Sequence, residues 1–165
     1  MNLIKHITLF FWTLIILGVV VFLIKQVAFG KRKINEEVNS SEAIYLGALI
    51  ISAGIILQRL IGYVAISYDN IYKMQLQHPF YQFVKSGSSI SVSGVILFGL
   101  SVFIAKFLST IFFGSRNAVI EFGNNNKAYA IVRSALIISV SLLFLQLAEN
   151  IIQYLIPTIS IPLYH

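Results

Sequence analysis

The sequence predicts an all-α integral membrane protein with four transmembrane helices, arranged as two parallel tandem helical-hairpin repeats. Hydrophobic residues make up 58% of the 165 residues and charged residues only 11%, far from the composition of soluble domains. Four apolar runs are each long enough to cross a hydrocarbon core of roughly 30 Å. The pentapeptide Ala-Leu-Ile-Ile-Ser occurs at 48–52 and again at 135–139, which indicates an internal repeat.

The four apolar runs lie at Ile7–Ile24, Ala43–Ile66, Ile90–Phe113 and Ala128–Ile156. Lipid offers the backbone no hydrogen-bonding partner, so a spanning segment must be a helix or a strand of a closed barrel. These runs are continuously apolar and lack the period-two alternation of barrel strands. We therefore expect four helices.

We expect a single membrane domain built from two repeats, the first at about 1–67 and the second at about 88–156. Two crossings return the chain to its starting side, so the repeats are parallel and related by an axis along the membrane normal. Between them, residues 68–87 are rich in aromatic side chains, which prefer the headgroup zone. This segment is expected to be a loop that lies on the membrane or, alternatively, binds a partner or gates. The tail at 157–165 is expected to be extended.

Two asparagines precede the repeated helices, because the repeat aligns Asn39 with Asn126. The side-chain oxygen of an asparagine at a helix N-cap accepts a hydrogen bond from an otherwise unpaired backbone amide. We expect both residues to be helix caps, with an anion site at the paired helix N-termini as the alternative.

The orientation follows from the basic residues. The expected cytoplasmic connections hold Lys25, Lys31, Arg32, Lys33, Arg116 and Lys127, with Lys106 close by, against Lys5, Lys73 and Lys85 on the other side. Lys and Arg are retained in the cytoplasm, so both termini are expected outside the inner membrane of a bacterium. The net charge of +6 is concentrated at helix ends, which favours anionic lipid headgroups at Lys31, Arg32 and Lys33 over nucleic acid as partner.

Polar residues inside the expected helices are the candidate functional residues, since polar groups at membrane depth are costly. In the last helix they recur at helical spacing, and the repeat aligns two of them with residues of the second helix. The stripe comprises Ser52, Arg59, Ser139, Gln146, Glu149, Asn150 and Gln153. We expect both parts to face a common interior, with Arg59 and Glu149 near the outer boundary. The stripe is either a helix–helix interface, in which Arg59 pairs with Glu149, or the lining of a pore.

Known enzyme patterns are absent from the sequence. There is no cysteine, and His6, His78 and His165 have no acidic residue at ligand spacing, so neither a thiol nucleophile nor a metal site is expected. Neither a glycine-rich phosphate loop nor a Gly-x-Ser-x-Gly elbow occurs. We expect no catalytic residues, no enzymatic activity and no cofactor.

One stretch resembles a known family. Residues 121–130 read Glu-Phe-Gly-Asn-Asn-Asn-Lys-Ala-Tyr-Ala and lead directly into an apolar helix. This is similar to the Asn-x-Ala-x-Ala helix entrance of YjfL-like proteins, small four-helix membrane proteins of bacteria with two parallel repeats. Asn39-Ser40-Ser41-Glu42-Ala43 keeps the asparagine and one alanine of that motif. The resemblance implies an inner-membrane protein with links to envelope stress and gives no catalytic residues.

The function expected from these observations is non-enzymatic: a structural, sensing or envelope-stress-related role, carried out by a homo-oligomer. The alternative is a small oligomeric pore or carrier for an ion or polar solute along the polar stripe. A third possibility is a subunit that anchors a soluble enzyme through the basic loop Lys31–Lys33. The expected protein partner is thus either another membrane protein or a cytosolic one.

Overall fold

The computed structural model describes residues 2–29, 38–75, 77–114 and 116–157. It contains five helices in this order: α1 (Asn2–Phe29), α2 (Ser40–Lys73), α3 (Pro79–Phe113), α4 (Ala118–Gly123) and α5 (Lys127–Leu155). All except α4 are long and apolar enough to cross a membrane. The prediction of an all-α fold with four such helices is confirmed.

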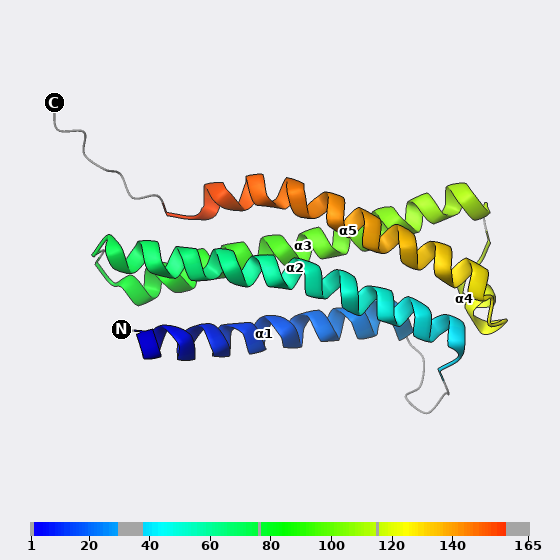
Figure 1. The fold of residues 1–165 in the computed structure, drawn as a ribbon, viewed down its shortest axis with the longest axis horizontal. Helices are drawn as coiled ribbons and strands as arrows, with labels where there is room; N and C mark the ends of the chain where they lie inside the picture. Colours follow the sequence, from blue (N-terminus) through cyan, green and yellow to red (C-terminus); the bar gives the residue numbers. More distant parts are fainter. Residues whose placement is uncertain (1, 30–37, 76, 115, 158–165) are drawn as a thin grey trace.

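The four long helices run side by side along the long axis of the molecule (Figure 1). At one end, which we name the cap end, Asn39 and Asn126 precede α2 and α5, and α4 lies beside them. At the other, which we name the turn end, residues 74–78 join α2 to α3. The start of α1 and the end of α5 also lie at the turn end. Two helical hairpins, α1–α2 and α3–α5, thus begin and end on the same side.

The bounds predicted for the aromatic loop, residues 68–87, are wrong. In the structure, α2 continues to Lys73 and α3 begins at Pro79, so only a short turn remains. Proline is well placed at the first position of a helix, where its missing amide would be unpaired anyway. Gln75 and His78 have positive φ angles of 50° and 56°, which reverse the chain direction in this short space.

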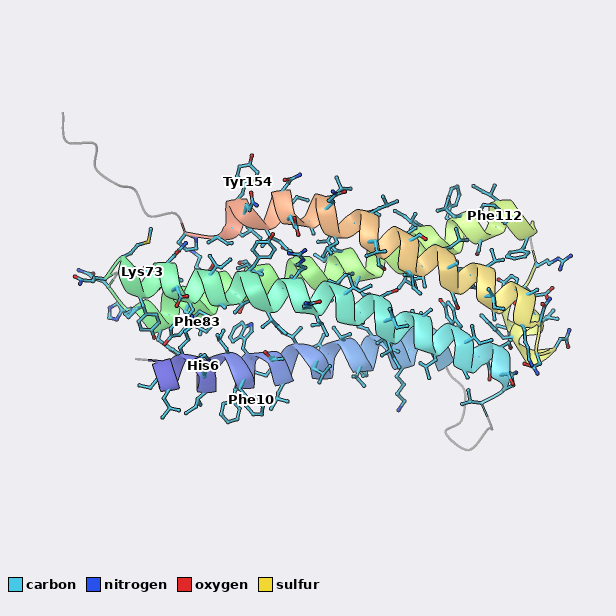
Figure 2. The ribbon with its side chains drawn as sticks, viewed as in Figure 1. His6, Phe10, Lys73, Phe83, Phe112 and Tyr154 are labelled. Atoms are coloured by element: carbon cyan, nitrogen blue, oxygen red, sulfur yellow. The ribbon has the colours of Figure 1, made fainter. Side chains whose placement is uncertain are left out.

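Aromatic rings of this segment pack inside the bundle as well as at its surface. Tyr68 is buried, and Phe83 is fully buried, with its ring 5.1 Å from that of Tyr68 and 5.3 Å from that of Trp12. Phe80 and Tyr81 are exposed. Figure 2 shows Phe83 directed between the helices. The segment therefore ties α1, α2 and α3 together at the turn end.

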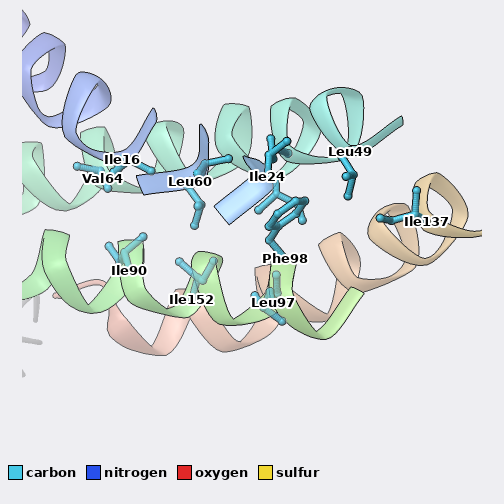
Figure 3. Close-up of a cluster of buried hydrophobic side chains, with 14 of the residues drawn as sticks. Ile16, Ile24, Leu49, Leu60, Val64, Ile90, Leu97, Phe98, Ile137 and Ile152 are labelled. Atoms are coloured by element: carbon cyan, nitrogen blue, oxygen red, sulfur yellow. The ribbon is translucent and has the colours of Figure 1, made fainter. Parts of the chain in front are cut away.

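The core is formed where α2, α3 and α5 pack against one another. Its large side chains include Leu60, Leu97, Phe98, Ile137 and Ile152, all 8% exposed or less (Figure 3). A Cβ atom at Gly94 would overlap the side chain of Leu60, so glycine lets α3 approach α2 closely there.

Helix α1 is peripheral. It packs mainly on α2 and buries a narrow strip, Ile16, Val20 and Ile24, with a spacing of one helical turn. Most of its other large apolar side chains are exposed, as suits a helix whose remaining surface faces lipid.

Candidate functional site

Arg59 of α2 and Glu149 of α5 form an ion pair. Arg59 Nε lies 3.6 Å from Glu149 Oε1, and the two side chains are 60% and 31% exposed. The separation is that of an ion pair rather than a hydrogen bond. The pair therefore bridges the two central helices at the surface of the bundle and not in its interior.

A groove runs along α2 beside this pair. Its volume is about 410 Å³, and it is lined by Gln58, Arg59, Gly62, Tyr63 and Ile66. Behind the pair, Leu60, Leu97 and Phe144 help enclose a cavity of about 10 Å³ between α2, α3 and α5. A cavity of that size holds at most about one water molecule. The groove is thus open to the surroundings of the bundle. The small cavity behind the ion pair does not continue the groove into a polar channel through the bundle.

Arg59 also lies deeper along its helix than the sequence suggested. Because α2 continues to Lys73, about 14 residues or roughly 21 Å separate Arg59 from the end of the helix. Helix α2 therefore continues well beyond Ile66, where the apolar run predicted from the sequence ends. Glu149, about six residues from Leu155, remains closer to the end of α5.

The polar stripe does not converge on a common interior, contrary to expectation. Ser52 is fully buried and its hydroxyl has no hydrogen-bond partner among the described residues. On α5, by contrast, four members of the stripe are exposed and Glu149 is partly exposed. These exposed members are Ser139, Gln146, Asn150 and Gln153. Tyr154, next to Gln153, points away from the bundle in Figure 2.

Helix geometry explains the outward direction of the α5 stripe. Two residues further along an α-helix, the side chain has turned by roughly 200°. Ala148 and Ile152 are buried against α2 and α3, so Gln146 and Asn150, two positions before them, point to the opposite side. Sequence periodicity identified the stripe, but it could not tell which face of α5 the other helices cover.

The structure places Asn39 and Asn126 at helix N-caps. The side chain of Asn39 accepts a hydrogen bond from the amide of Glu42, and the Glu42 carboxylate accepts one from the Asn39 amide, which completes a capping box. The Asn126 side chain accepts a hydrogen bond from the amide of Tyr129. Both helix starts therefore have their amides partly satisfied by side chains of the chain itself.

These caps also fasten the two hairpins together. Asn39 Nδ2 donates a hydrogen bond to the carbonyl of Phe122 at 2.6 Å, and the Ser41 amide donates one to Asn125 Oδ1 at 2.9 Å. Asn126 Nδ2 donates to Glu121 Oε2 at 2.6 Å. The start of α2 is thus held against α4 and the turn that follows it. The repeated asparagine predicted the caps, whereas the role of Asn125 could not be read from the sequence.

A buried arginine lies next to this junction. Arg133 of α5 is 8% exposed, and its guanidinium carbon lies 5.1 Å from the centre of the Tyr45 ring, 5.7 Å from that of Phe122 and 5.8 Å from that of Tyr129. Its Nη1 donates a hydrogen bond to Tyr129 Oη at 2.9 Å. Among the described residues, no carboxylate forms a salt bridge with Arg133, and its buried Nε has no hydrogen-bond partner. Three aromatic faces therefore supply much of the favourable electrostatic environment of this cation.

The turn end is held by a separate set of polar contacts. Lys5 Nζ lies 2.7 Å from Asp69 Oδ2, and Trp12 Nε1 donates a hydrogen bond to Ser91 Oγ at 3.0 Å. Asn70 Nδ2 donates to the carbonyl of Pro157. These contacts attach α1 and the end of α5 to the central helices.

The described part of the chain holds no group of three metal-binding side chains. His165 and the basic residues Lys31, Arg32 and Lys33, with most of the tail at 157–165, lie outside the described residues. Comparison of the chain with models of protein families, with curated proteins and with solved structures finds no match.

Proposed function

We propose that this chain is a non-enzymatic integral membrane protein of the bacterial inner membrane that works as a homo-oligomer in a structural or sensing role. The observation that carries the proposal is the outward direction of the α5 stripe, in which Gln146, Asn150 and Gln153 are exposed on an apolar bundle. A polar side chain facing lipid is costly, and such side chains favour hydrogen bonds across helix interfaces. A protein partner on this face would satisfy them.

A connection to envelope stress is part of this proposal. Its support is the resemblance of residues 121–130 to YjfL-like proteins, and those residues include Phe122, Asn125 and Asn126 of the junction at the cap end. A change in membrane thickness or tension would act on the hydrogen bonds that join the hairpins there. Deleting the gene should then alter the activity of an envelope-stress reporter in the host, and reintroducing the intact gene should restore it.

A second candidate is a pore or carrier formed between copies. It is favoured by one specific observation: Arg59, 60% exposed, lies on a groove of about 410 Å³ and beside Glu149. If several copies directed this groove toward a common axis, the charged pair would line a hydrated path. The small apolar cavity behind the pair argues against a path through one copy.

One double variant separates the two candidates. Arg59→Leu with Glu149→Ala removes both charges and leaves the apolar packing of α2 and α5 in place. If the protein has the structural role, the double variant should change its assembly or its thermal stability. If the protein forms a pore, the variant should change ion flux into proteoliposomes while assembly stays intact. A variant that alters neither assembly, stability nor flux would contradict both assignments of this site. The matched control, Lys85→Met, removes an exposed charge near the start of α3 at the turn end, away from the groove, and should leave assembly, stability and flux unchanged.

We also propose two roles for the basic loop that contains Lys31, Arg32 and Lys33. The loop binds anionic lipid headgroups, and it anchors a membrane or cytosolic protein partner. The support is the local concentration of basic residues. If a soluble partner co-purifies with the protein in a fixed ratio, replacing all three basic residues by glutamine should weaken the co-sedimentation of that partner with the protein. If purification from native membranes yields no such partner, the role as an anchor is contradicted.

A further inference from the structure

We infer that α5 carries the contact surface for a second copy of this chain, and that the two α5 helices pair with each other along Ser139, Leu143, Gln146, Asn150 and Gln153. We name these five residues the α5 seam. The inference rests on the oligomer proposed above and specifies its interface.

The spacing of the α5 seam is that of a coiled-coil contact. Successive members are separated by four, three, four and three residues, which corresponds to alternating d and a positions of a heptad. Helices that pair in this way cross at about 20°, the commonest geometry of membrane helix bundles. All five residues are exposed in the single chain. The pattern is therefore complete and unoccupied over about four turns of α5.

Burial elsewhere on α5 follows the opposite face. Ile137, Ala148 and Ile152 are at most 4% exposed and pack into the core. They occupy positions of the heptad that point away from the α5 seam. One helix thus has two contact faces: an apolar face for its own bundle and a mixed polar face with no partner within the described chain.

The chemistry of the α5 seam fits a second copy rather than an unrelated partner. Two copies inserted with the same topology are related by an axis along the membrane normal, so each residue meets its own equivalent at the same depth. Gln146 and Asn150 suit this arrangement, because a carboxamide is both donor and acceptor and can pair with an identical group. Asparagine at an a position is the residue that fixes register and pairing in parallel two-stranded coiled coils.

The ends and the edge of the α5 seam agree with this geometry. Ser139 is small and would let the two helix backbones approach closely at the cap-end side of the contact. Glu149 lies in a g position at the edge, where its charge is balanced by Arg59 of the same chain at 3.6 Å. The pairing therefore brings no unbalanced carboxylate into the contact.

Cysteine cross-linking in native membranes tests the inference, because the chain has no cysteine of its own. Single variants Ser139→Cys, Gln146→Cys and Gln153→Cys are oxidised, with Ile96→Cys and Phe103→Cys on the exposed face of α3 as matched controls. We expect the seam variants to give severalfold more disulfide-linked dimer than the controls. The fluorescence of Trp12 checks that each variant is folded.

Co-isolation of two differently tagged copies is measured in parallel, so that the interface and the oligomer are tested separately. Co-isolation with no preference for seam cysteines would overturn the α5 seam and leave the oligomer standing. No co-isolation at all would overturn both. Cross-linked species of another mass would identify a different partner. Rapid reaction of Gln146→Cys with a membrane-impermeant maleimide would overturn the paired seam in favour of a hydrated pore.

A second variant tests the role of the amides. Gln146→Leu with Asn150→Leu keeps the side chains close in size and removes the paired carboxamides. We expect severalfold weaker dimer formation in lipid, measured by energy transfer between labelled copies at increasing dilution. Unchanged or stronger dimer formation would contradict the amide pairing. The double variant Ile96→Leu with Phe103→Leu is the control and should leave dimer formation unchanged.

Discussion

Ser52 and Ser139 are the last residues of two identical pentapeptides, yet Ser52 is fully buried and Ser139 is exposed. The difference extends through the pentapeptides: Ile50 is 55% exposed, whereas its counterpart Ile137 is fully buried. The same local sequence therefore presents opposite faces to the core in α2 and in α5. Two hairpins with similar sequences pack asymmetrically within one chain, and the face that α2 buries is left open on α5.

Gly94 sets the distance between α2 and α3. Gly94→Ala should destabilise the bundle by about 1–3 kcal/mol, because the added methyl group overlaps the side chain of Leu60. Gly99→Ala on the same helix is the control: apart from the adjacent residues and the nearby backbone of α3, no atom lies within 4 Å of the added Cβ, and alanine favours a helix. Thermal unfolding in detergent micelles measures both. Equal melting temperatures for the two variants would contradict the close approach.

Tyr129 supports the buried cation of Arg133. Tyr129→Phe keeps the aromatic ring and removes the hydroxyl that accepts the hydrogen bond from Arg133 Nη1. A second donor of a buried guanidinium is then unpaired, which should cost about 1–3 kcal/mol of unfolding free energy. Tyr154→Phe, at a tyrosine that is 92% exposed, should change nothing measurable. Denaturant titration measures the unfolding free energy of both variants. Equal values for Tyr129→Phe and Tyr154→Phe would contradict a stabilising hydrogen bond between Arg133 and the Tyr129 hydroxyl.

Asn39 has two roles and should therefore be the more sensitive cap. Asn39→Ala removes the cap of α2, worth about 1 kcal/mol, and also the hydrogen bond to the Phe122 carbonyl. Asn117→Ala removes a comparable side-chain cap from the six-residue helix α4, where it accepts from the exposed amide of Val119. We expect a clearly larger loss of stability for Asn39→Ala. Hydrogen exchange of the first turn of α2 would localise it, and equal effects would argue against the link between hairpins.

Trp12 is the only tryptophan in the sequence and reports on the attachment of α1. Ser91→Ala removes the hydrogen bond from Trp12 Nε1, so the fluorescence maximum should move to shorter wavelength. Ser89→Ala, whose hydroxyl bonds to the carbonyl of Lys85 on the same helix, should leave the spectrum unchanged. A shift of the same size in both variants would mean that Trp12 does not contact Ser91.

Much of the fold could be predicted from the sequence, because apolar length alone determines which segments can cross a membrane. The helix starts at Asn39 and Asn126 were also accessible, since capping is a local interaction. The end of α2 was not. Tyr68 and Phe83 suggested a surface loop by composition, but they are buried by contacts with each other and with α1, which depend on the assembled bundle.

The residues of the candidate site could be predicted from the sequence, but the side of the bundle toward which they point could not. Periodicity placed Gln146, Glu149 and Asn150 on one face of a helix, and the pairing of Arg59 with Glu149 is found in the structure. Which face points inward depends on how α5 rotates against α2 and α3. In lipid, apolar side chains suit either side of a helix, so composition gives little information on that rotation. The aromatic environment of Arg133 likewise draws on α2, α4 and α5 at once.

The most direct test of the central claim is a cryo-EM structure of the purified protein in lipid nanodiscs. We predict a map with two copies in which the α5 helices meet along Ser139, Gln146 and Asn150, with Arg59 and Glu149 at the edge of the contact. A map in which these residues face lipid in a single copy would contradict the account. So would a map in which they surround a hydrated central space, a result that would favour the pore.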